Sequence, residues 1–99
     1  MGGQHKVDFL KFSGHALGQM FARLISVDEV RIVVEQGEVI ASYPDDSPYP
    51  SELRLGFAGE RALHVVFAYD EVLRTAYVVT AYVPDPKIWS EDLRSRRKQ

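Results

Sequence analysis

Leu63–Tyr69, the stretch LHVVFAY, is a run of apolar residues with a histidine in its second position. β-Branched and aromatic residues of this kind favour a strand, and such a short run is typical of a strand with a buried face. A buried polar group costs stability unless it forms hydrogen bonds. His64 therefore has two interpretations, a satisfied core histidine or a catalytic or binding group, and its neighbours in the fold must decide between them.

The same alternating pattern predicts strands on both sides of this stretch. The predicted strands are Glu38–Tyr43, Leu53–Ala58, Arg61–Tyr69 and Thr75–Tyr82. Gly59 leads a tight hairpin between the second and the third, and a longer turn joins the third to the fourth. The segment YPDDSPYPSE, residues 43–52, is rich in proline, serine and aspartate and predicts an exposed flap. The strands thus form a mainly antiparallel four-stranded sheet.

The length of the first hairpin decides which way His64 faces. With two or four loop residues, His64 shares a sheet face with Leu53 and Leu55, whereas three residues send it to the side of Arg54 and Val65. Both faces are apolar enough to require a cover. The C-terminal stretch KIWSEDLRSRR, residues 87–97, is one candidate for the second cover, with Trp89 as its core anchor. A partner protein is the other.

Two helices are predicted before the sheet. In ISVDEV, residues 25–30, Ser26 can cap a helix while Glu29 closes a capping box, and Gly37 marks its end. In HALGQMFARLI, residues 15–25, the apolar face consists of Leu17, Met20, Phe21 and Leu24. The opposite face is a polar ridge of His15, Gln19 and Arg23.

The chain is therefore an α+β domain: two N-terminal helices packed on a mainly antiparallel four-stranded sheet, with a short C-terminal helix. Its 99 residues, 45% of them hydrophobic, are enough for one domain. We expect an ordered core from about residue 8 to 90 and a basic tail over 91–99.

Composition excludes several classes of protein. The chain has no cysteine, and His5, His15 and His64 are not closely spaced, so we expect neither a metal site nor a cofactor. No apolar run approaches a membrane span and no signal peptide is evident, which indicates a cytoplasmic protein. The net charge is −2, but residues 87–99 carry +3 and the rest −5. Such a basic end suits either a nucleic-acid contact or a solvated tail.

No strong catalytic motif is present, but a dispersed set could act on RNA. Metal-free cleavage of RNA needs a base, an acid and a cation for the phosphorane charge. Histidine, tyrosine and arginine can supply all three functions. The candidates are His15, Arg23, Arg54, Arg61, His64 and Tyr82, each of which also has a purely structural explanation.

The order of these segments along the chain also resembles that of a known family. HALGQMFARLISVDEV, GEVIASYPDD, LRLGF, LHVVFAY and VVTAYVPDP resemble the bacterial DUF4258 family from about His15 to Trp89. The chain departs from the family at Gln19, where arginine is frequent, and at Leu24, where glycine is frequent. The layout of helices and strands is also similar to the RelE, ParE and BrnT toxins, which implies a small ribonuclease-like fold.

This resemblance implies a toxin-like, RNA-directed module, either a metal-independent endoribonuclease or an RNA binder. Its predicted catalytic residues are His64, His15, Arg23 and Tyr82, and its predicted nucleic-acid-binding residues are Arg54, Arg61, Arg94 and Arg96. The alternative is a non-catalytic protein-interaction domain, in which both histidines are structural and the second sheet face docks a partner or a second copy. An RNA module should gather its cations around an accessible histidine, whereas an interaction domain should expose an apolar patch.

Overall fold

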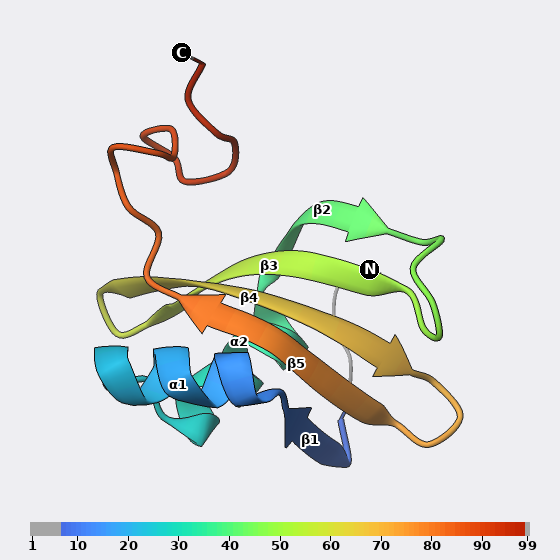
Figure 1. Ribbon diagram of the computed structural model, residues 1–99. Helices are drawn as coiled ribbons and strands as arrows, with labels where there is room; N and C mark the ends of the chain where they lie inside the picture. Colours follow the sequence, from blue (N-terminus) through green and yellow to red (C-terminus); the bar gives the residue numbers. More distant parts are fainter. Residues whose placement is uncertain (1–6, 99) are drawn as a thin grey trace.

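The computed structural model describes residues 7–98 and contains two helices and one five-stranded sheet (Figure 1). His5 and Gln99 lie outside the described residues. The helices are α1 (Gly14–Arg23) and α2 (Val27–Gln36). The strands are β1 (Phe9–Phe12), β2 (Glu38–Tyr43), β3 (Ser51–Ala58), β4 (Arg61–Asp70) and β5 (Thr75–Tyr82). The predicted α+β class is confirmed.

The sheet has one strand more than predicted, in the order β1-β5-β4-β3-β2. The additional strand, β1, pairs in parallel with β5, with Phe9 opposite Thr75, and the other pairs are antiparallel. The prediction of a four-stranded sheet was therefore wrong, although three of the four strand pairs are antiparallel. The cause is the short length of β1 and the distance to its partner, because a parallel strand has no hairpin to announce it in the sequence.

The predicted C-terminal helix is also absent. Residues 87–98 form turns, closed by an isolated bridge between Trp89 and Arg96. Side chains satisfy the backbone locally, since Asp92 accepts a hydrogen bond from the amide of Arg94, and Leu93 adopts a left-handed φ of 65°. Short polar side chains compete with helical hydrogen bonds in this way.

The start of α2 is as predicted, with both hydrogen bonds of the Ser26–Glu29 capping box in place. Gly37 ends the helix, but its φ of −70° requires no glycine. A Cβ at this position would lie 2.5 Å from the carbonyl oxygen of Val33 and 3.0 Å from that of Leu55. Gly37 is therefore needed for the close approach of β3 to the last turn of α2.

Helix α1 presents a different face to the core from the predicted one. Met20 is buried together with Ala16, whereas Leu17 is 50% exposed, Phe21 85% and Leu24 82%. The helix packs against β5 near the edge of the sheet, so only a narrow stripe finds cover. Amphipathic spacing located the apolar residues of α1 correctly, but it could not show that this chain leaves most of them uncovered.

Both helices cover one face of the sheet, and the hydrophobic core lies between these layers. The second face, called the open face below, carries His64. Ala58 pairs with Arg61 and Leu55 pairs with His64, so the hairpin loop has two residues. This is the first of the two predicted arrangements, and it places His64 opposite the helices.

Candidate functional site

His64 lies on the open face beneath residues 85–98, which we call the C-terminal segment. Its side chain has no exposed surface. The ring of Trp89 packs edge-on against the imidazole, with the centroids 4.4 Å apart. Leu93 and Tyr82 supply the polar contacts, so three residues from β5 and the C-terminal segment close around one histidine.

Each ring nitrogen of His64 has one partner. Nε2 lies 2.9 Å from the carbonyl oxygen of Leu93, and Nδ1 lies 3.2 Å from the hydroxyl of Tyr82. A carbonyl can only accept, so Nε2 carries the proton and Nδ1 accepts from Tyr82. Burial lowers the pKa of His64, and the hydrogen bond to Leu93 opposes that shift only in part. The geometry and the pKa both favour a neutral imidazole that is sealed from substrate.

Tyr82 lies at the border between this sealed site and the exposed part of the open face. Burial raises the pKa of its hydroxyl, and the charge of Arg96 opposes that change. The guanidinium of Arg96 also lies over the ring of Trp89, at 5.5 Å from its centroid. A cation and a tyrosine therefore meet where the C-terminal segment reaches β5.

His15 is the accessible histidine of the predicted pair. It projects from the first turn of α1, and its Nε2 lies 3.1 Å from the hydroxyl oxygen of Thr80 on β5. Ser13 caps the same helix end and also donates a hydrogen bond to the carbonyl of Val79. These contacts hold an exposed imidazole at the edge of the sheet, two residues along β5 from Tyr82.

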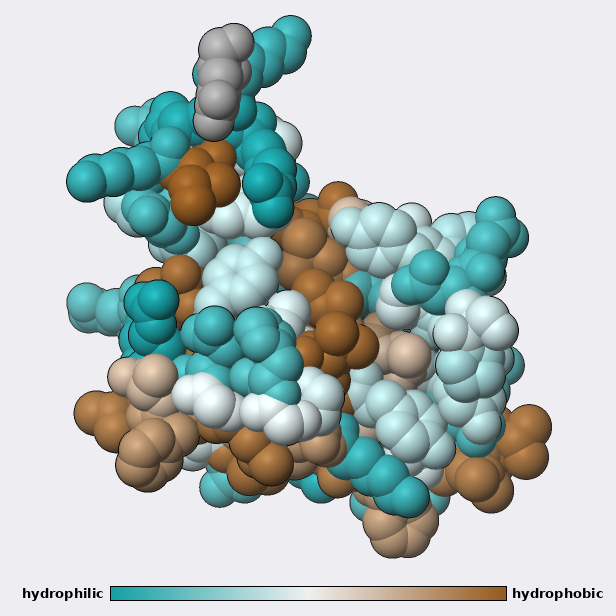
Figure 2. Space-filling model, in the orientation of Figure 1, coloured by the Kyte–Doolittle hydropathy of each residue, from teal (hydrophilic) through white to brown (hydrophobic). Residues whose placement is uncertain are grey.

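An apolar groove runs along the open face beside the flap that joins β2 to β3. It has a volume of about 510 Å³ and is lined by Pro48, Tyr49, Val66, Ala68, Tyr77 and Val79, with Asp46, Ser47 and Ser51 at the flap. Figure 2 shows hydrophobic side chains along the middle of this face, between the C-terminal segment and paler residues on the other side. The flap therefore forms one wall of an open groove and does not cover the open face of the sheet.

Stacked aromatic rings form one end of the groove. Tyr49 lies parallel to Tyr77, with 5.5 Å between centroids, and the amino group of Lys11 lies 5.9 Å from the centre of the Tyr77 ring. A hydrogen bond to Asp70 raises the pKa of Tyr49. These contacts position both tyrosines and bring a cation from β1 onto the open face.

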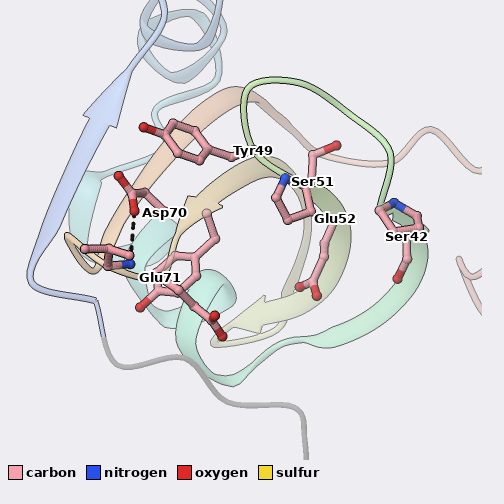
Figure 3. A pocket seen from close by; sticks show the side chains of 10 residues that line it. Ser42, Tyr49, Ser51, Glu52, Asp70 and Glu71 are labelled. Carbon is pink, nitrogen blue, oxygen red and sulfur yellow. Dashed lines mark hydrogen bonds between the residues drawn. The ribbon is translucent and has the colours of Figure 1, made fainter.

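A second cavity, of about 500 Å³, shares Tyr49 and Ser51 with the groove. Figure 3 shows Tyr49 and Asp70 on one wall and Ser42 on the other, with Glu52 between them. Carboxylates give this cavity an acidic character. An anionic ligand on the open face would therefore avoid the flap side and lie toward Lys11, β5 and the C-terminal segment.

Three of the predicted phosphate-binding arginines are held by contacts within the chain. Arg54 is 1% exposed on the helix-covered face, where it donates to the carbonyl of Gly37 and pairs with Glu52. Arg61 donates to the carbonyls of Arg23 and Leu24 and pairs with Glu29. Arg94 forms a two-pronged pair with Glu38, with contacts of 2.8 to 3.1 Å. These side chains do not converge on one positive surface.

Other predicted and unpredicted cations are exposed on the surface. Within residues 7–98, no ion pair involves Lys11, Arg23 or Arg96, and all three are exposed. Sequence reasoning named the two arginines but missed Lys11, Tyr49 and Tyr77. The only local signal for Lys11 was the alternation in FLKF, and the tyrosines become neighbours only when the flap folds back.

Two absences concern the described part of the chain. No group of three or more His, Asp or Glu side chains there could hold a metal ion. None of its helices is long and apolar enough to cross a membrane.

A family model described as "Domain of unknown function (DUF4258)" matches residues 12–83. The chain belongs to the DUF4258 family. The match runs from the end of β1 through β5, so the DUF4258 domain includes His15, His64 and Tyr82, whereas the C-terminal segment that seals His64 follows it. Comparison with curated proteins and with solved structures found no significant match.

Proposed function

We propose that this DUF4258 domain binds single-stranded RNA across the open face of its sheet. The observation that carries the proposal is the arrangement of aromatic rings and unpaired cations on that face: Lys11 beside Tyr77 and Tyr49 at one end, and Arg96 beside Tyr82 at the other. Tyrosine rings stack on bases of any sequence, and Lys or Arg contacts phosphates.

Residues at the edge of the sheet also favour RNA as the ligand. His15 and Thr80 lie between the two ends, and Arg23 follows on the polar ridge of α1. Phosphates that follow Lys11, His15 and Arg96 lie on the β5 side of the groove, while the carboxylates Glu52, Asp70 and Glu71 line the second cavity behind Tyr49. This is the binding form of the RNA-directed module expected from the sequence, in which the predicted Arg96 is kept and Lys11 replaces Arg54, Arg61 and Arg94 as a phosphate contact.

A nuclease of this architecture would have to use His15 rather than His64. An acid or base must reach the proton that it transfers. His15 is exposed and contacts Thr80, two residues before Tyr82, whereas His64 is sealed and already bonded at both nitrogens. The cleavage form of the proposal therefore assigns proton transfer to His15.

Fluorescence anisotropy with labelled single-stranded RNA tests the binding. Short uridine-rich and adenosine-rich RNAs are titrated with the full chain, with EDTA present, at about 50 and about 200 mM salt. Binding should weaken with salt. Lys11→Gln and Arg96→Gln should each weaken it several-fold and lower the salt slope by about 0.7 per lost phosphate contact.

Arg31→Gln is the matched control, because it removes the same charge from α2 on the other side of the sheet. Its affinity should equal that of the parent chain. Equal losses in all three variants, or no salt-sensitive binding at all, would overturn the proposal. The same mixtures on a denaturing gel test cleavage, which His15→Ala should abolish and His64→Gln should retain.

The alternative function, protein interaction, is favoured by a separate surface. The outer side of α1 exposes Leu17, Phe21 and Leu24, which form an apolar patch distant from the groove. This patch is compatible with an RNA ligand on the open face, because the two surfaces do not overlap.

A further inference from the structure

The α1 patch consists of Leu17, Gly18, Phe21 and Leu24. Figure 2 shows brown and tan side chains along the lower left margin of the molecule, where α1 lies in Figure 1, below teal and white residues on its front. Phe21 and Leu24 are more exposed than any other large apolar residue of the described chain except Val72. Exposed apolar side chains that lie together usually mark a contact surface.

Within residues 7–98, no neighbouring atom explains why position 18 is a glycine. A Cβ at Gly18 would meet no atom within 4 Å, and the same is true at Gly14 one turn earlier. Glycine inside a helix costs about 1 kcal/mol relative to alanine. A helix that carries this cost without a contact inside the chain leaves open space on its outer side, three residues before Phe21 on the same helix.

We propose that two copies of this chain pair through the α1 patch. A two-fold axis at Gly18 sets the two helices antiparallel, and Phe21 of each copy then lies about 4.5 Å beyond the axis, against the open space near Gly14 of the other. The patch carries both the large side chain and the space that receives it. Such self-complementarity is what a symmetric dimer requires.

Area and charge agree with a second copy as the occupant. Leu17, Phe21 and Leu24 together expose on the order of 400 Å² of side chain. Two such patches with their rims approach the roughly 1,000 Å² that a specific contact needs. No charged residue lies within the patch, so two identical copies meet without repulsion at its centre.

Sedimentation equilibrium of the full chain tests the proposal, from about 5 to about 500 μM, a range that suits a weak dimer. The mass should rise with concentration from 11.2 kDa toward twice that value. Gly18→Gln and Phe21→Ser should each raise the dissociation constant at least tenfold. Val72→Ser, which changes an equally exposed residue on the β4–β5 turn, should leave it unchanged.

Gly18→Gln also distinguishes lost association from lost folding. Glutamine is the better helix former, so this variant should unfold at a higher urea concentration than the parent while it dimerises less. A chain that stays at 11.2 kDa at every concentration would overturn the proposal. A dimer that tolerates both patch substitutions would overturn it as well. RNA binding uses other residues, so the two experiments fail independently.

Discussion

His64 is a polar residue whose interior position is stabilised by specific partners. Removal from water disfavours the charged imidazole, while Leu93 and Tyr82 satisfy the neutral one. The residue therefore acts as a core side chain at neutral pH. The same contacts make it sensitive to acid, because a second ring proton would have to be accommodated in a buried site.

The free energy of unfolding should fall as the pH drops from about 7.5 to about 5.5. The unfolded chain binds a proton at His64 near pH 6.5, whereas the folded chain binds it only at lower pH, so acid favours unfolding. The loss begins as the pH passes below 6.5 and ends at the lowered pKa of the folded state. Urea unfolding at three pH values, followed by circular dichroism, measures it.

His64→Gln should remove most of this dependence, while His15→Gln should keep it because His15 is exposed. The lowered pKa values of Glu29, Glu38 and Asp92 affect stability only at more acidic pH, below their ordinary values near 4. An unchanged slope in His64→Gln would show that other groups cause the effect.

Leu24 is a second residue that affects stability, because its backbone conformation is unfavourable for a residue with a side chain. It ends α1 in the left-handed conformation, with φ 55° and ψ 48°. A side chain is disfavoured there and glycine is not. Leu24→Gly should therefore stabilise the fold by about 1 kcal/mol, measured by urea unfolding at low micromolar chain concentration.

Ala22→Gly is the control, because the same new residue inside α1 should destabilise by about 1 kcal/mol. Equal losses in both variants would mean that Leu24 makes contacts that outweigh its strain.

The glycines of α1 and α2 have different structural roles. Gly37 lets β3 approach the end of α2, whereas Gly18 faces open space on α1. The local sequence does not distinguish these positions, since each is a glycine in or next to a predicted helix. What differs is the neighbouring element, which only packing supplies.

Alanine substitutions at these two glycines should have opposite effects. Gly37→Ala places a methyl group 2.5 Å from a backbone oxygen, so the structure must shift, at a cost of about 1 to 3 kcal/mol. Gly18→Ala should gain up to about 1 kcal/mol through helix propensity. Thermal unfolding of both variants compares them, and a loss in each would contradict the open space outside Gly18.

The C-terminal segment covers one end of the open face and is held there by two kinds of contact. Trp89 is buried against His64, whereas Arg94 and Glu38 pair at the surface. Burial of a tryptophan contributes several kcal/mol, while an exposed ion pair contributes 1 kcal/mol or less, even with the geometry seen here. The apolar anchor should therefore dominate.

Trp89→Ala should destabilise the fold by about 3 kcal/mol, and Arg94→Ala by less than about 1 kcal/mol. Urea unfolding followed by circular dichroism compares them, since the first variant lacks the only tryptophan. Similar losses in the two variants would mean that the ion pair, rather than the indole, holds the segment.

Short-range patterns in the chain were sufficient to predict α2 and four of the five strands. They also predicted the two-residue hairpin as one of two alternatives. A capping box, a glycine turn and alternation each involve residues a few positions apart, so their physics is complete within the segment. The choice of His64 and Trp89 as central residues follows from the same local signals.

Contacts between distant segments decided the rest. The parallel pairing of β1 with β5, the exposure of α1 and the burial of Arg54 depend on which surfaces meet across tens of residues. The arrangement of Lys11 and Tyr77, from β1 and β5, has the same origin. Hydrophobicity indicates that a residue can be buried, but only the tertiary structure supplies the neighbour that buries it or leaves it exposed.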